Sequence, residues 1–349
     1  MKRSALIFMG ITFILSSCGQ NLELESMRTL DQGELIGLKG ENSTYTWKGV
    51  PFAEPPVGEL RWKETQKAKA WNGRLEATKF QQGCFQRASF FENGEGKWSG
   101  GEDCLYLNIW TPQLSNQEIK ESSKKLPVMM WIHGGANVMG SAHTYDPSSL
   151  VSNHEVVVVT IQYRMGPLGW FRHPALHTEE SSLEDRSGNY GTLDTIMALR
   201  WIKENIHHFG GDPDNVTVFG ESAGGHNSAA IFASPLAQGL FHKVIVESGI
   251  MSVSSIDAAE SYLPEDRIAP TVSGLEIFNQ VLIQNGKAEN IKQAKEIQEQ
   301  MDPKEIRDLL YQQSPNVLLK AVDESGPKRD GMTRVFPDGL VILSGGIKE

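Results

Sequence analysis

Cysteine is scarce in this sequence, with three among 349 residues, at positions 18, 84 and 104. That number is too small for a scaffold built on disulfides. Histidine and carboxylate residues do not recur at metal-ligand spacing, so the sequence predicts neither a metal site nor a cofactor. No internal repeat, low-complexity tract or long block of like charge is present. The absence of these features excludes repeat arrays and charged tails.

Positive charge is also in deficit, because 33 basic residues face 43 acidic ones and the formal net charge is −10. Nucleic acid and anionic membrane surfaces repel such a chain, so neither is expected as a partner. The composition is 39% apolar and 22% charged, which is typical of a globular protein with a buried core. The length allows one large domain or two ordinary ones. The oligomeric state is left open.

The apolar run at the N-terminus is too short to cross a membrane. Positive residues in "MKR" precede an uncharged, mostly apolar stretch over residues 5–15, and this predicts a signal peptide over residues 1–17. The following "LSSC" resembles a bacterial lipobox, in which Cys18 becomes the lipidated N-terminus of the mature protein. An ordinary signal peptide that contains Cys18 is the alternative. Both interpretations predict export, and the first predicts a cell-envelope protein that touches the membrane only through a lipid anchor.

The two remaining cysteines, Cys84 and Cys104, lie 20 residues apart. In an oxidising compartment such a pair favours a disulfide, which would contribute about 3 kcal/mol on the chain-entropy model. Two free buried thiols are the alternative.

Four apolar runs, at residues 128–132, 156–161, 216–219 and 244–246, predict strands. Continuous runs of this kind are typical of parallel strands that are covered on both faces. Residues 192–206 carry one apolar face at helical spacing. Strands that alternate with helices predict an α/β fold, with a mostly parallel sheet and helices on both faces.

Three further stretches complete the predicted organisation. Residues 34–62 contain short β-prone runs broken by turns and predict an antiparallel element. Residues 85–103 are rich in Gly, Ser, Glu and Asn and predict a surface loop. Residues 288–313 predict one or two surface helices broken at Pro303.

One serine stands out by its surroundings. Ser222 lies in "GESAG", with the predicted strand 216–219 before it and a run of small residues, 223–233, after it. A strand, a sharp turn and a helix in this order expose a serine above the sheet edge, as in a nucleophile elbow. The motif alone is weak, but this context makes Ser222 a candidate nucleophile.

A second glycine-rich turn, "HGGA" at residues 133–136, follows another predicted strand. Backbone N–H groups in such turns stabilise the negative charge that develops on a carbonyl oxygen during acyl transfer. Gly135, Ala136 and Ala223 are the predicted donors. An isolated "HGG" favours a plain strand-end turn, and only the pairing with Ser222 favours catalysis.

With these motifs in place, the chain resembles the type B carboxylesterases, the cholinesterase-like branch of the α/β-hydrolase fold. The matching stretches are "FGGDPDNVTVFGESAGG", "EDCLYLN", "KGVPFAEPPVGELRW", "YRMGPLGW", "GNYGTLD" and "VESG", in the family's order and spacing. The similarity is dense over roughly residues 30–255. The resemblance implies a single carboxylesterase domain over residues 18–349, incomplete at its C-terminal end.

The resemblance also implies roles for individual residues. Ser222 is the implied nucleophile, and Gly135, Ala136 and Ala223 are the implied oxyanion hole. Further implied features are a Cys84–Cys104 disulfide, an Arg61–Glu102 ion pair, and Glu221 as a buried carboxylate beside the site rather than the triad acid. Ala136 stands where a third glycine is common, which implies a tighter acyl pocket, and Asn137 stands where an aromatic residue is common.

The general base is the missing part. After Ser222 the chain contains two histidines, His226 and His242, and neither is predicted to reach the serine. In the family, the triad acid and histidine follow well beyond the residues that this chain matches.

The sequence therefore predicts a serine hydrolase of small-molecule carboxylic esters that works through an acyl-enzyme and lacks its acid and histidine. The alternatives are an inactive fragment and a non-catalytic, cholinesterase-like binding protein of the cell envelope.

Overall fold

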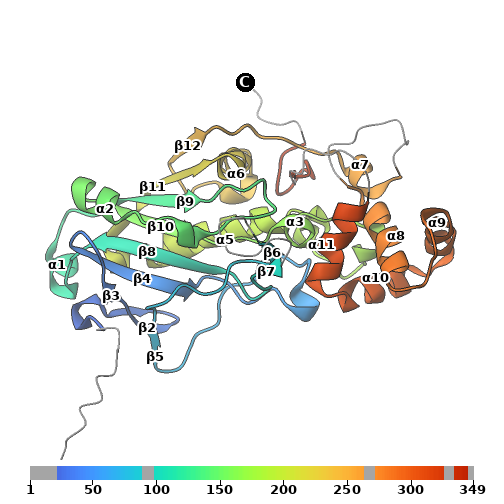
Figure 1. The fold of residues 1–349 in the computed structure, drawn as a ribbon. Helices are drawn as coiled ribbons and strands as arrows, with labels where there is room; N and C mark the ends of the chain where they lie inside the picture. The colour runs from blue at the N-terminus through green and yellow to red at the C-terminus, as the bar shows by residue number, and fades with distance from the viewer. Residues whose placement is uncertain (1–21, 89–97, 263–271, 326–333, 345–349) are drawn as a thin grey trace, which may run out of the picture.

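The computed structural model describes residues 22–88, 98–262, 272–325 and 334–344, and the predicted signal peptide and Cys18 lie outside them. A mixed seven-stranded sheet runs through the centre of the molecule and is flanked by helices (Figure 1). Its strand order is β12-β11-β9-β10-β8-β4-β3. The strands are β3 (Leu38–Lys39), β4 (Thr44–Pro51), β8 (Tyr106–Pro112), β9 (Leu126–Ile132), β10 (Val157–Ile161), β11 (Gly211–Glu221) and β12 (Lys243–Glu247).

The four apolar runs of the sequence form neighbouring parallel strands. β9 pairs in parallel with β10 and with β11, and β11 pairs in parallel with β12. Every residue of β10 is buried, as expected for a β-branched strand covered on both faces. The predicted α/β class and the parallel block are therefore confirmed.

The sequence predicts that all four parallel strands are covered on both faces, and this prediction is wrong for β12. This strand lies at the edge of the sheet, where Ile245 and Val246 are 43% and 40% exposed. Its apolar sequence "VIV" matches that of a buried strand, but no strand in the described residues pairs with its outer edge.

The other half of the sheet is antiparallel, because β8 pairs in this sense with both β10 and β4, and β4 pairs likewise with β3. A small second sheet contains β1 (Arg28–Leu30), β2 (Gly33–Ile36) and β5 (Arg74–Glu76). The antiparallel element predicted for residues 34–62 is thus confirmed in β3, β4 and their neighbours.

Two helices support the parallel strands. The helix predicted over 192–206 is α5 (Tyr190–Asn205), and 13 of its 16 residues are buried. The small-residue helix after Ser222 is α6 (Ala223–Phe232), which packs on β11 and β12. α2 (Ser148–His154) packs on β8.

The C-terminal helices gather at one side of the molecule, in orange and red in Figure 1. Helix α9 ends at Gln300 and α10 begins at Pro303, so the predicted break is confirmed. The helices here are α8 (Gly274–Gln284), α9 (Ile291–Gln300), α10 (Pro303–Gln312) and α11 (Pro315–Glu324). The shorter elements are α1 (Asn116–Glu121), α3 (Gly166–Gly169), α4 (Leu183–Ser187), α7 (Ile256–Glu260), β6 (Gln86–Arg87) and β7 (Trp98–Ser99). None of the helices in the described ranges is long and apolar enough to cross a membrane.

Candidate functional site

Ser222 occupies the sharp turn between β11 and α6. Its φ and ψ are 57° and −118°, a conformation that a residue with a side chain adopts only when the surrounding structure enforces it. Its backbone N–H donates to the carbonyl of Glu247, at the end of β12, over 2.9 Å. The strand, the turn and the helix follow one another as a nucleophile elbow requires.

The glycines around Ser222 allow the elbow to pack against β9. A Cβ atom at position 224 would lie 1.9 Å from the carbonyl oxygen of Ile132, and one at position 220 would lie 2.6 Å from the same oxygen. Both distances are far below van der Waals contact, so only glycine fits. The backbone of α6 therefore reaches the end of β9, where the second glycine-rich turn begins.

This second turn, residues 134–136, lies directly against the elbow. A Cβ atom at Gly134 would be 3.4 Å from the Cβ of Ser222 and 2.8 Å from the carbonyl oxygen of Glu221. Gly135 and Ala136 have φ of 112° and 56°. In the part of the chain that the structure describes, no hydrogen bond takes up their N–H groups. The structure thus places the turn that contains Gly135 and Ala136 beside Ser222, which Ala223 follows.

Glu221 differs from the expectation. The resemblance implies a buried carboxylate, but Glu221 is exposed. Its backbone ends β11, where it pairs with Glu247 of the edge strand β12.

The buried side chain of His133 contacts the glycine turn, residues 134–136, that directly follows it. Its ring is fully buried, stacks on Tyr163 at 4.5 Å between centroids, and places Nδ1 2.8 Å from the carbonyl oxygen of Gly134. Burial lowers the pKa of His133 from 6.5 to about 4, so the ring is neutral at pH 7. The hydroxyl of Tyr163 donates to the His133 carbonyl over 2.7 Å. These two residues brace the turn.

The two histidines after Ser222 are engaged elsewhere. The Nδ1 atom of His226, in α6, lies 2.7 Å from the carbonyl oxygen of Ile250 and 2.9 Å from the backbone nitrogen of Ser252. That of His242 accepts the N–H of Val216 over 3.1 Å. Burial lowers the pKa of His226. Both rings hold local backbone structure.

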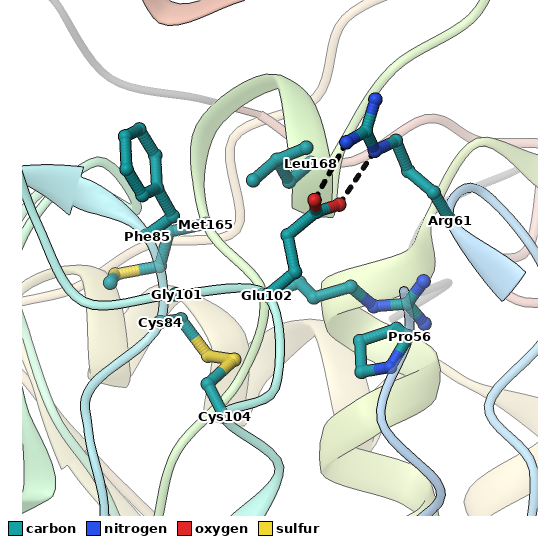
Figure 2. Close-up of a pocket in the computed structure, with 10 residues that line it drawn as sticks. Pro56, Arg61, Cys84, Phe85, Gly101, Glu102, Cys104, Met165 and Leu168 are labelled. Atoms are coloured by element: carbon teal, nitrogen blue, oxygen red, sulfur yellow. Dashed lines mark hydrogen bonds and ion pairs between the residues drawn. A yellow bond between two sulfur atoms is a disulfide. The ribbon is translucent and has the colours of Figure 1, made fainter. Parts of the chain in front are cut away.

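The remaining residues implied by the resemblance form a separate cluster (Figure 2). Cys84 and Cys104 are joined by a disulfide. Beside it, Nε and Nη2 of Arg61 each donate to a carboxylate oxygen of Glu102 over 2.6 Å. The cavity between these side chains measures about 10 Å³, room for one water. The cluster is structural in character and offers no space for a substrate.

A larger hollow, of about 330 Å³, borders the loop that continues from the glycine turn. Gln86 and Ser141 line it, and Gln86 bonds both the N–H and the carbonyl of Gly140. None of the predicted site residues lines this hollow. Among the described residues, no group of three His, Cys, Asp or Glu side chains could hold a metal ion.

The architecture and the elbow together define the α/β-hydrolase fold, and solved esterases share it. Residues 25–327 match the carboxylesterase family, and the chain belongs to that family.

Individual relatives agree with this assignment. The chain is 45% identical over 236 residues to the para-nitrobenzyl esterase of Bacillus subtilis, covering 67% of this chain and 45% of that protein. It is 39% identical over 293 residues to human cocaine esterase, and the match covers 80% of this chain and 49% of that protein. A solved para-nitrobenzyl esterase superposes with a TM-score of 0.69 at 34% identity, over 91% of this chain and 59% of that one. A solved carboxylesterase of Geobacillus stearothermophilus superposes with a TM-score of 0.69 at 33% identity, over 90% of this chain and 57% of that one. The chain therefore spans about half the length of these relatives.

Sequence reasoning missed one part of the site. Asn137 is fully buried and faces Asn227 of α6. The two residues are 90 positions apart, and no spacing pattern connects them.

Proposed function

We propose that this chain carries the nucleophile and the oxyanion hole of a serine hydrolase of small-molecule carboxylic esters. The observation that carries the proposal is the backbone of Ser222, held at φ 57° and ψ −118° opposite the turn of residues 134–136. Strain of this kind persists at a functional site because it presents the side chain to a substrate. The names of the relatives, several of which are esterases, support the same reaction class.

In the proposed reaction, Oγ of Ser222 attacks the ester carbonyl carbon while a base takes its proton. The carbonyl oxygen becomes an oxyanion and accepts hydrogen bonds from the N–H groups of Gly135, Ala136 and Ala223. The bond to the alcohol oxygen then breaks, and the alcohol leaves with a proton. Water attacks the acyl-enzyme by the same route, which releases the carboxylic acid and restores the serine.

The expected rate of ester hydrolysis depends on which group accepts the proton of Ser222. Nδ1 of His226 and Nδ1 of His242 both contact backbone atoms, so we assign neither ring as the base and propose that this chain lacks the triad acid and histidine. Hydrolases that lose the base keep only residual catalysis from the oxyanion hole and substrate binding. We therefore expect the 349-residue chain to be several powers of ten slower than a full-length relative.

Hydrolysis of a short p-nitrophenyl ester by the 349-residue chain and by Ser222→Ala tests the proposal. We expect slow hydrolysis that Ser222→Ala abolishes. Equal rates for the two proteins, after subtraction of the buffer rate, would show that this chain is an inactive fragment or a non-catalytic binding protein.

We also propose that Cys18 is lipidated and anchors the exported protein in a bacterial envelope membrane. The support is the sequence of residues 1–18 alone. Expression in a bacterium fed an alkyne fatty acid should label the protein and place it in the membrane fraction, whereas Cys18→Ala should lose the label. An unlabelled wild-type protein would leave an ordinary signal peptide as the explanation.

A further inference from the structure

Three consecutive residues, the last two of the glycine turn and the one that follows it, have left-handed backbones. The φ angles of Gly135, Ala136 and Asn137 are 112°, 56° and 60°. Ala136 and Asn137 carry side chains, so this conformation has to be enforced by contacts around the turn. The contacts of Asn137 show where that enforcement comes from.

Asn137 is anchored through both its backbone and its side chain. Its carbonyl oxygen accepts the N–H of Gly166 over 2.6 Å. Its side-chain Oδ1 accepts Nδ2 of Asn227 over 2.8 Å, and its own Nδ2 donates back to Oδ1 of Asn227 over 3.4 Å. The two amides are 0% and 2% exposed. The hydroxyl of Tyr163 also lies 3.4 Å from Oδ1 of Asn137, so Asn227 is the nearer of two side chains that contact this oxygen, and losing a buried hydrogen bond is costly.

Asn227 lies in α6, four residues and about one helical turn after Ala223. The helix backbone therefore holds Asn227 in a constant position relative to the N–H of Ala223. On the other side, Asn137 directly follows Ala136. The amide pair thus connects the two segments that supply the proposed oxyanion donors.

We propose that the Asn137–Asn227 pair positions the oxyanion hole by setting the separation between the N–H groups of residues 135–136 and that of Ala223. This inference rests on the proposed function. The pair touches neither substrate nor reacting atoms, and it acts through the donors that it holds. Its loss lets the turn relax away from the elbow, which weakens hydrogen bonds to the transition state more than it weakens substrate binding.

Asn227→Ala is the informative variant, because alanine favours the helix backbone at this position and removes only the amide. We expect kcat for a short p-nitrophenyl ester to fall by about ten- to hundredfold while KM stays within about twofold. Asn108→Ala is the matched control. It removes a buried amide that bonds Gly49 and Thr160 in the sheet, and we expect it to lower stability and leave kcat unchanged. An unchanged kcat in Asn227→Ala would overturn the proposal.

Hydrogen exchange separates this inference from the proposed function. The N–H groups of Val138 and Met139 donate to the carbonyl of Gly135, so their protection reports on the turn without any turnover. Asn227→Ala should speed their exchange about tenfold or more, while residues 126–132 and the Asn108→Ala protein stay as in the wild type. If the wild type proves inert but this exchange rises, the esterase proposal fails and the positioning role stands. If exchange in the turn does not change, the positioning role fails whatever the activity.

Discussion

Several residues around Ser222 hold backbone conformations that side chains normally avoid. Ser222, Ala136 and Ser248 have φ of 57°, 56° and 51°, and such residues cost on the order of 1–3 kcal/mol each. Ser248 follows Glu247, whose carbonyl accepts the Ser222 N–H. The close packing of glycine backbones around these residues offsets the strain.

Gly224 is the residue on which this packing depends most. A methyl group there would lie 1.9 Å from the Ile132 carbonyl, so Gly224→Ala has to push α6 away from β9. We expect the free energy of unfolding to fall by about 3 kcal/mol or more, measured by urea denaturation. Gly83→Ala is the control, since its nearest new contact is 3.4 Å. Similar stability losses in the two variants would refute the tight approach of α6.

His133 gives the protein a predicted pH dependence. Its pKa falls from 6.5 to about 4 on folding, so between these values the unfolded chain binds a proton that the folded protein does not. Stability should therefore decrease as the pH falls from about 6.5 towards 4, by up to about 1.4 kcal/mol per pH unit for this residue. Denaturant titrations of the wild type and of His133→Gln at pH 7, 6 and 5 measure how much His133 contributes to the pH dependence of the unfolding free energy. Parallel profiles for the two proteins would contradict the assignment.

At the scale of elements, Arg61 links distant parts of the chain. Its guanidinium bonds Glu102 beside the disulfide, and Nη1 donates to the carbonyl of Gln313, the residue after α10, over 2.7 Å. The Arg61 side chain is 7% exposed and that of Glu102 14%. The N-terminal segment, the disulfide loop and the C-terminal helices thus meet at one buried ion pair.

Arg61→Ala leaves the Glu102 carboxylate without its partner. We expect a loss of about 3 kcal/mol in unfolding free energy, measured by denaturant titration. Arg61→Met combined with Glu102→Leu should recover much of this loss, because it removes both charges. Lys124→Ala is the control, since it breaks a pair with Glu155 whose side chains are both 69% exposed and should cost less than about 1 kcal/mol. A double variant no more stable than Arg61→Ala would contradict this explanation.

The helices and strands were predictable where the apolar pattern agrees with the residues that end an element, such as proline and glycine. The uninterrupted runs at 128–132 and 156–161 identified β9 and β10, and Pro303 identified the break before α10. Helix α8 was missed, although Ser273 and Glu276 form a capping box at its start and this signal is readable in the sequence. The pattern "VIV" does not by itself predict the exposure of β12, because it is the same whether or not another element covers the strand. The expectation of an exposed apolar edge came instead from the incomplete sheet that the family resemblance implies.

The candidate site also has parts that were predictable from the sequence and parts that were not. Ser222 and the glycine turn were predictable because each motif is local and follows a strand. The Asn137–Asn227 contact was not, because it depends on how closely α6 approaches the turn, which is a property of the folded chain.

At the scale of the whole molecule, the described residues leave an apolar edge of the sheet exposed at β12. Beyond Ile245 and Val246 in β12, Ile250 is 81% exposed. Exposed apolar edge strands template the pairing of further chains. The net charge of −10 opposes association without covering this edge.

We expect the 349-residue chain to self-associate as its concentration rises, and Val246→Lys to suppress this association. Sedimentation velocity over a range of concentrations measures the effect. Leu183→Lys is the matched control, because it replaces a 66% exposed leucine in α4, away from β12, and should change little. Equal suppression by both variants would attribute the effect to net charge rather than to the edge.

The nucleophilic role of Ser222 is tested most directly by covalent trapping. Prolonged incubation of the 349-residue protein with excess fluorophosphonate, followed by peptide mass spectrometry, locates every serine that reacts. We expect slow modification confined to Ser222, weaker in Asn227→Ala and absent in Ser222→Ala. A wild-type protein that reacts at other serines to the same extent, or does not react at Ser222 at all, would contradict the assignment of Ser222 as the nucleophile.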